Sequence, residues 1–146
     1  MKSTSGYAFS LGSGIFSWAS KKQATVAQLT AEAEYVAATK ATSQAIWLRR
    51  ILAEMGEQQD GPTTIYYDNK SAIAMTKNPV HHSRTKHIAI KYHFIREVET
   101  TKEIKMVYCK IEEQVADIFT KALPRGRFEQ FHTMIGVREI CIKEEC

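Results

Sequence analysis

Apolar residues recur at intervals of three and four positions between residues 30 and 55, which is the spacing of one face of an α-helix. These positions are Ala33, Ala37, Ala41, Ala45, Leu48, Leu52 and Met55. Thr30 is a candidate N-cap and Gly56 a candidate C′ residue, so the pattern predicts a helix between them. Because such a helix is long for a globular protein, the pattern also allows a break near Thr42 and Ser43.

Runs of β-forming residues predict strands on both sides of this helix. The runs at 7–11 and 15–19 flank a glycine-bearing loop at 12–14 and predict a β-hairpin. Residues 63–67 predict a short, largely buried strand, and residues 104–109 predict the next one. Further helices are expected at residues 71–77, 88–98, 112–122 and 128–135. The order ββαβααβαα predicts a mixed α/β fold with helices packed on a sheet.

Composition fits one globular domain. The chain has 146 residues, of which 44% are apolar and 25% charged, and a chain of this length buries about 68–70% of its unfolded surface. We expect residues 1–137 to form the domain and residues 138–146 to be an unassigned tail. The net charge of +4 permits a nucleic-acid partner without requiring one.

Hydropathy and cysteine usage bear on location. No apolar stretch approaches the roughly 20 residues that span a bilayer, and no signal-peptide core follows the N-terminus. The three cysteines lack CxxC spacing, which favours a reducing compartment. We therefore expect an intracellular protein, in a cytoplasmic particle or the nucleus, without a membrane partner.

The acidic residues are unevenly placed. Asp68 directly follows a predicted strand, Asp117 lies in the helix after the next strand, and Glu32 and Glu34 open the long helix. Ligands of open α/β sheets gather at the carboxyl ends of strands, so acids from these three elements could converge. Carboxylates gathered in one place repel each other unless cations join them, and Mg²⁺ is the natural partner. Two such ions can activate water against a phosphodiester.

Each acid also has a purely structural explanation, and the pattern leaves both open. Asp68 can cap the short helix that follows it. Glu32 and Glu34 suit a helix N-terminus because of the helix dipole. Asp117 can pair with Lys121 four residues later, a contact worth about 0.2–0.5 kcal/mol on a helix surface.

Five stretches taken in order carry a resemblance to a known family. They are KSTSGYAFSLGSGIFSWASKKQ, TAEAEYVAA, IWLRRIL, YYDNKSAIAMTKNPVHHSRTKHIAIKYHFIRE and EEQVADIFTKALPRGRFEQF. Together they resemble the ribonuclease H domain of copia-type LTR retrotransposon Pol polyproteins, from Lys2 to about Val137. The resemblance implies a ribonuclease H-like mixed sheet flanked by helices. It also implies an endonuclease that uses two Mg²⁺ ions to cut the RNA strand of RNA/DNA hybrids.

The resemblance also implies roles for particular residues. By position, Glu34, Asp68 and Asp117 match the family's catalytic and metal-binding carboxylates, with Glu32 as the alternative to Glu34. Nucleic-acid contacts are expected from residues beside this site, namely Asn69, Lys70, Arg84 and Lys86. The implied partners are an RNA/DNA hybrid and the reverse transcriptase portion of the same polyprotein.

The sequence departs from the family at its start. In the family, a central strand carrying the first aspartate precedes the Ser-Thr-Ser-Gly-Tyr motif, whereas here that motif begins at Ser3 and no acid occurs before Glu32. Three of four carboxylates are therefore present, and we expect the chain alone to be catalytically incomplete. The position of the missing strand could be filled by upstream polypeptide, by a strand from a partner or a second copy, or by collapse of the hairpin onto its neighbour.

A second departure concerns product release. Many ribonucleases H carry a histidine on a loop before the last aspartate, and the segment from Lys110 to Glu113 is too short to hold that loop.

A non-catalytic nucleic-acid-binding module, or a domesticated remnant of the element, is the alternative function.

Overall fold

A computed structural model of the chain describes residues 4–22, 30–68 and 86–138. Its elements are β1 (Thr4–Leu11), β2 (Gly14–Lys22), α1 (Thr30–Glu54), β3 (Thr63–Tyr67), α3 (Lys86–Thr100), β4 (Ile104–Tyr108), the short 3₁₀ helices η2 (Ile111–Glu113) and η3 (Val115–Phe119), and α4 (Arg125–Met134). They form two compact units, a larger one mainly of residues 30–68 and 86–114 and a smaller one mainly of 6–20 and 115–138. The mixed α/β class is as predicted.

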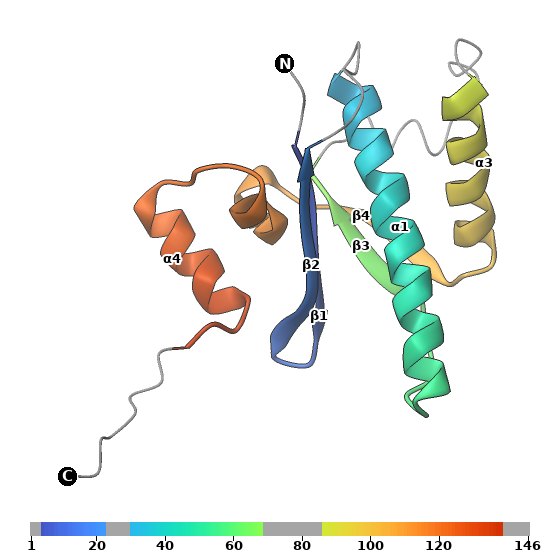
Figure 1. Ribbon diagram of the computed structural model, residues 1–146, viewed down its shortest axis with the longest axis horizontal. Coiled ribbons are helices and arrows are strands. Elements are labelled where there is room, and N and C mark those ends of the chain that lie inside the picture. The colour runs from blue at the N-terminus through green and yellow to red at the C-terminus, as the bar shows by residue number, and fades with distance from the viewer. Residues whose placement is uncertain (1–3, 23–29, 69–85, 139–146) are drawn as a thin grey trace. The chain divides into compact units, whose positions relative to one another are not determined.

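The larger unit is a parallel strand pair packed against two helices. β3 and β4 pair in parallel, with Thr63 opposite Ile104 and Tyr67 opposite Tyr108. Both α1 and α3 contact β4 and each other, and α1 also contacts β3 (Figure 1). Among the residues of this unit whose burial is described, the buried apolar ones are Tyr35, Ala38, Ala41, Ala45, Ile65, Tyr67, Ile95, Val98, Ile104 and Cys109. Burial of these side chains is the main force that holds the unit together.

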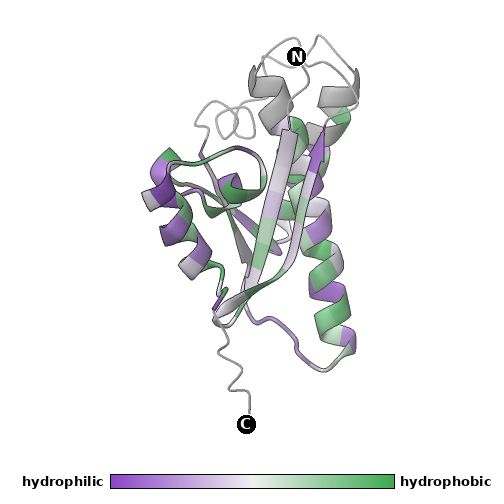
Figure 2. Cartoon of the chain, turned by 60° about the vertical axis from the view of Figure 1, so that its left-hand side comes forward, coloured by the Kyte–Doolittle hydropathy of each residue, from purple (hydrophilic) through white to green (hydrophobic). Residues whose placement is uncertain are grey.

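Helix α1 is continuous from Thr30 to Glu54, so the structure does not have the break that its length allowed. Hydrophobic and hydrophilic residues alternate along it, as Figure 2 shows. Gly56 ends the helix as predicted, because its φ of 88° lies in the left-handed region. The N–H groups of Gly56 and Glu57 donate to the carbonyls of Ala53 and Leu52, which is the Schellman arrangement.

The loop between α1 and β3 is fixed by one side chain. Arg49 Nη1 donates to the carbonyl of Gly61 at 2.7 Å and to Thr63 Oγ1 at 2.9 Å. Its Nη2 donates to the carbonyl of Gln59 at 3.4 Å. Arg49 therefore ties the start of β3 to the helix that covers the strand.

The smaller unit contains the predicted hairpin, with a tighter turn than expected. Only Gly12 and Ser13 lie between β1 and β2, whereas the sequence predicted a three-residue loop. Gly12 has φ of 63°, as the first central position of a type II′ turn requires. Helix α4 buries Phe131 completely and is followed by Gly136 at φ of 85°, so the predicted stop is confirmed.

The segment at 112–122 corrects a prediction. A single α-helix was expected there, and the structure has η2 and η3 separated by Gln114, whose backbone is extended at ψ of 92°. The expected apolar side is only half-buried, and the buried residue of η3 is Asp117. The extended backbone at Gln114 interrupts the hydrogen-bond ladder that a continuous helix would need.

The strand pairing also differs from a single sheet. Within the described residues, β1 pairs with β2 and β3 pairs with β4, as two separate two-stranded sheets. In the predicted fold a central strand lies between these two pairs, and what fills that position stays a prediction. The predicted helix at 71–77 lies outside the described residues. None of the helices in the described part is both long and apolar enough to cross a membrane.

Candidate functional site

Asp68 occupies the position that the sequence predicted. It follows β3 directly and is half-buried. Since β3 and β4 are parallel, both strands end at the same edge of their sheet. Asp68 therefore lies at the edge where α/β proteins commonly bind ligands.

Within the described residues β3 pairs with β4 alone, and we call its other side the open edge. Thr63 N–H donates to the carbonyl of Glu103, and Cys109 N–H donates to the carbonyl of Tyr67. In a parallel ladder alternate residues face the same neighbour, so the backbone groups of Thr64 and Tyr66 point away from β4. This edge is the one that a further strand could use.

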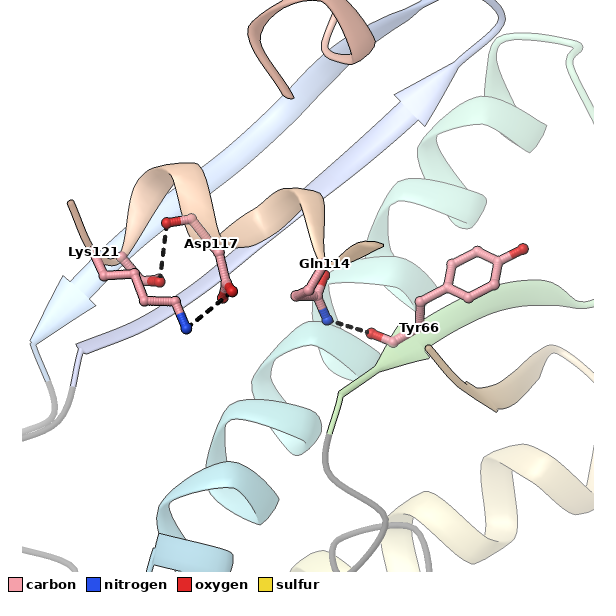
Figure 3. A network of polar contacts seen from close by, with 5 residues as sticks. Tyr66, Gln114, Asp117 and Lys121 are labelled. Carbon is pink, nitrogen blue, oxygen red and sulfur yellow. Dashed lines mark hydrogen bonds and ion pairs between the residues drawn. The ribbon is translucent and has the colours of Figure 1, made fainter. Parts of the chain in front are cut away.

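A side chain covers part of this edge. Gln114 Nε2 donates to the carbonyl of Tyr66 at 3.1 Å (Figure 3). The side-chain N–H of Gln114 donates to this carbonyl as the backbone N–H of a neighbouring strand would. Sequence reasoning missed Gln114, because a contact between residues 48 positions apart leaves no local pattern.

Asp117 is the buried acid of the smaller unit. It is 7% exposed, although charged residues are rarely buried unless they are paired. Lys121 Nζ lies 2.9 Å from its Oδ2, while the lysine side chain is 50% exposed (Figure 3). The i,i+4 pairing anticipated from the sequence is thus confirmed.

Close packing holds η3 in place within the smaller unit. A side chain at Gly6 would overlap with the Thr120 methyl group, so only glycine permits this approach of β1 to η3. On β2, the ring of Trp18 stacks on Phe119 with a centroid separation of 6.3 Å and an interplanar angle of 12°. These two contacts position the helical turn that carries Asp117.

Several of the predicted site residues, or their side chains, lie outside the described part of the chain. Glu34 and its alternative Glu32 belong to α1, but their side chains are not among those described. Asn69, Lys70 and Arg84 lie outside the described residues, and Lys86 is described only as the first residue of α3. Their roles stay predictions.

The donor chemistry of the two described aspartates suits a hard cation. Both offer carboxylate oxygens, which Mg²⁺ prefers, and Asp117 already attracts one positive group, the Lys121 ammonium. Among the described side chains, no three acids, histidines or cysteines form a group that could hold a metal ion. Asp68 and Asp117 belong to different units, so the convergence of Glu34, Asp68 and Asp117 stays a prediction.

Sequences similar to this chain occur in retrotransposon polyproteins. Its homologues are retrovirus-related Pol polyproteins from transposons. It is 43% identical over 136 residues to the Pol polyprotein from transposon TNT 1-94 of Nicotiana tabacum, a match that covers 93% of this chain. It is 41% identical over 138 residues, or 94% of the chain, to those from transposons RE1 and RE2 of Arabidopsis thaliana.

The chain spans about a tenth of the length of these polyproteins, namely 10% of the tobacco protein and of RE2 and 9% of RE1. No protein-family model matches the sequence, and no solved structure matches it. The homology therefore shows that sequence similar to this chain occurs within Pol polyproteins. It does not by itself show what this chain does.

Proposed function

We propose that the chain is the ribonuclease H segment of a copia-type retrotransposon Pol polyprotein. Its activity would be Mg²⁺-dependent cleavage of the RNA strand in RNA/DNA hybrids. The observation that carries this proposal is homology to Pol polyproteins over 93–94% of the chain. The position of Asp68 at the end of a parallel strand supports it. The burial of Asp117 in η3, the second short helix after β4, is also in keeping with it.

In this proposal Glu34, Asp68 and Asp117 hold the cations. Two Mg²⁺ ions would activate the attacking water and stabilise the leaving oxygen. The task of the protein is to fix the carboxylates in a partly buried site, where charge is less screened than at the surface. Asn69, Lys70, Arg84 and Lys86 would contact the hybrid, and basic residues there would give salt-dependent binding.

The chain needs additional polypeptide for this activity. It has no acidic residue before Glu32, so a fourth carboxylate would come from another segment or another copy. The open edge of β3, formed by the backbone of Thr64 and Tyr66, offers a place for a strand that carries it. Polypeptide of the same polyprotein is the preferred source, since the related proteins are far longer than this chain.

The test is a cleavage assay on a labelled RNA/DNA hybrid with Mg²⁺. The chain alone should be inactive, and the chain joined to the preceding segment of a Pol polyprotein should cut the RNA strand. In the joined protein, Asp68→Asn and Asp117→Asn should each lower the rate at least about a hundredfold, the scale of losing an electrostatic catalytic group. Asp60→Asn is the matched control, because Asp60 is the remaining aspartate and lies exposed in the loop before β3.

A joined protein that never cleaves would refute the nuclease proposal. Hybrid binding that weakens steeply with salt and survives Asp68→Asn would then favour the alternative, a non-catalytic binding module. This second function needs no fourth carboxylate, which fits the absence of an acidic residue before Glu32, and the net charge of +4 permits a nucleic-acid partner.

A further inference from the structure

We propose that Lys121 is a built-in counter-ion that occupies the Asp117 carboxylate until a divalent cation displaces it. Lys121 would therefore lower the metal affinity of the site and keep Asp117 neutralised while no metal is bound. This inference rests on the proposed function, because it assumes that Asp117 is a metal ligand. It adds a role for a residue that is not itself a ligand.

The two partners differ in burial, and this asymmetry is the first argument. Asp117 is 7% exposed, whereas the Lys121 side chain is 50% exposed and reaches the carboxylate from the surface. A buried carboxylate is costly without a positive partner. The lysine can leave at little cost, because an ammonium on a flexible four-carbon stem is well solvated in water.

Competition for the same oxygen is the second argument. Lys121 Nζ lies 2.9 Å from Asp117 Oδ2, and a Mg²⁺ ion would bind a carboxylate oxygen at about 2.0–2.1 Å. A cation on Oδ2 would then lie within about 5 Å of the ammonium, where two positive charges repel each other strongly in a partly buried site. Lys121 must therefore move before the cation can bind this oxygen.

Another ion pair of the smaller unit provides a matched comparison. Arg125 Nε lies 2.8 Å from Glu129 Oε1, also with i,i+4 spacing, but these side chains are 92% and 61% exposed. Removing the Arg125 charge changes the net charge by the same amount as removing the Lys121 charge. A difference in metal affinity between the two variants therefore depends on where the removed charge lies and not on the change in net charge.

The experiment measures Mn²⁺ binding to the full chain by titration calorimetry and by the loss of the free-ion electron paramagnetic resonance signal. Lys121→Gln should bind Mn²⁺ about tenfold more tightly than the wild type. Lys121→Arg should match the wild type, because it keeps the charge, and Arg125→Gln should also match it. Asp117→Asn should weaken binding in every background.

Thermal unfolding gives a second measurement that needs no catalysis. Without metal, Lys121→Gln should unfold at a lower temperature than the wild type, because its buried Asp117 lacks a counter-ion. Saturating Mn²⁺ should raise the unfolding temperature of this variant by more than that of the wild type. An equal rise in both would contradict the displacement of Lys121.

The outcomes separate this inference from the proposed function. Equal Mn²⁺ affinity in the wild type and Lys121→Gln, lost in Asp117→Asn, would overturn the role of Lys121 and leave the metal site standing. An equal gain in Lys121→Gln and Arg125→Gln would also overturn it. Binding that is unaffected by Asp117→Asn, or no binding in any variant, would overturn the role of Lys121, whereas the cleavage assay on the joined protein decides the proposed function.

Discussion

The two units of this chain are held together in different ways. The larger unit buries apolar side chains from α1, α3, β3 and β4, including Ile95 at 1% exposure and Ile104 at 2%. Among its described residues, the smaller unit buries one large apolar side chain completely, Phe131, and the other buried residue is the charged Asp117. On its hairpin, Trp18 remains 58% exposed.

This difference bears on where each unit is vulnerable. The larger unit has an apolar core, but β3 has an open edge that one glutamine side chain partly covers. The smaller unit depends on close backbone approach at Gly6, aromatic stacking of Trp18 on Phe119, and one ion pair. Core substitutions should therefore damage the larger unit most, and substitutions that alter close packing should damage the smaller one.

The largest expected effect is in the core of the larger unit. Ile95→Ala should lower the free energy of unfolding by about 2–5 kcal/mol, because it removes buried methyl groups and leaves a cavity. Ile90→Ala is the control on the same helix, since Ile90 is 68% exposed, and it should change the free energy by less than about 0.5 kcal/mol. Urea unfolding of both variants checks this, and equal costs would mean that α3 packs in another way.

A smaller effect is expected from crowding in the smaller unit. Gly6→Ala should lower the free energy of unfolding by about 1–3 kcal/mol, because the new methyl group meets the Thr120 methyl group and has little room to move. Thr120→Ser removes that methyl group, so the double variant should recover much of the loss. Additive costs in this double-mutant cycle would show that the two positions do not touch.

The sequence predicted the elements whose signals are local. The extent of α1, its end at Gly56 and the end of the last helix near Gly136 all follow from nearby residues, and the structure agrees, although Met55 of the predicted apolar face is 72% exposed. The position of Asp68 was predictable because a strand pattern directly precedes it. The Asp117–Lys121 pair was also predictable, because i,i+4 spacing within one turn is a local property.

The errors come from non-local contacts. The apolar spacing of Val115, Ile118 and Phe119 is typical of a helix, but the backbone at Gln114 is extended and its side chain binds a distant strand. No local pattern encodes that contact. For the same reason the meeting of Glu34, Asp68 and Asp117 stays a prediction, because it depends on how separate elements pack and not on their individual patterns.

The smallest expected effect concerns the open edge of β3. Gln114→Ala should lower the free energy of unfolding by only about 0.5–1.5 kcal/mol, the net value of one hydrogen bond. Gln114→Glu should cost at least as much, because a carboxylate cannot donate to the Tyr66 carbonyl. Gln130→Ala, at an exposed position of α4, is the control and should have almost no effect. Urea unfolding measures all three.

The same substitution can sharpen the comparison between the units. If Gln114 takes the place of a strand at this edge, then polypeptide that pairs with β3 will donate a hydrogen bond to the Tyr66 carbonyl. The hydrogen bond from Gln114 will then be lost. In the chain joined to the preceding segment of a Pol polyprotein, Gln114→Ala should therefore cost less than in the chain alone. Hydrogen exchange should also show slower exchange of the Thr64 or Tyr66 amide in the joined protein, because a new strand would accept bonds from that edge. An unchanged cost together with unchanged exchange would mean that the added polypeptide docks elsewhere.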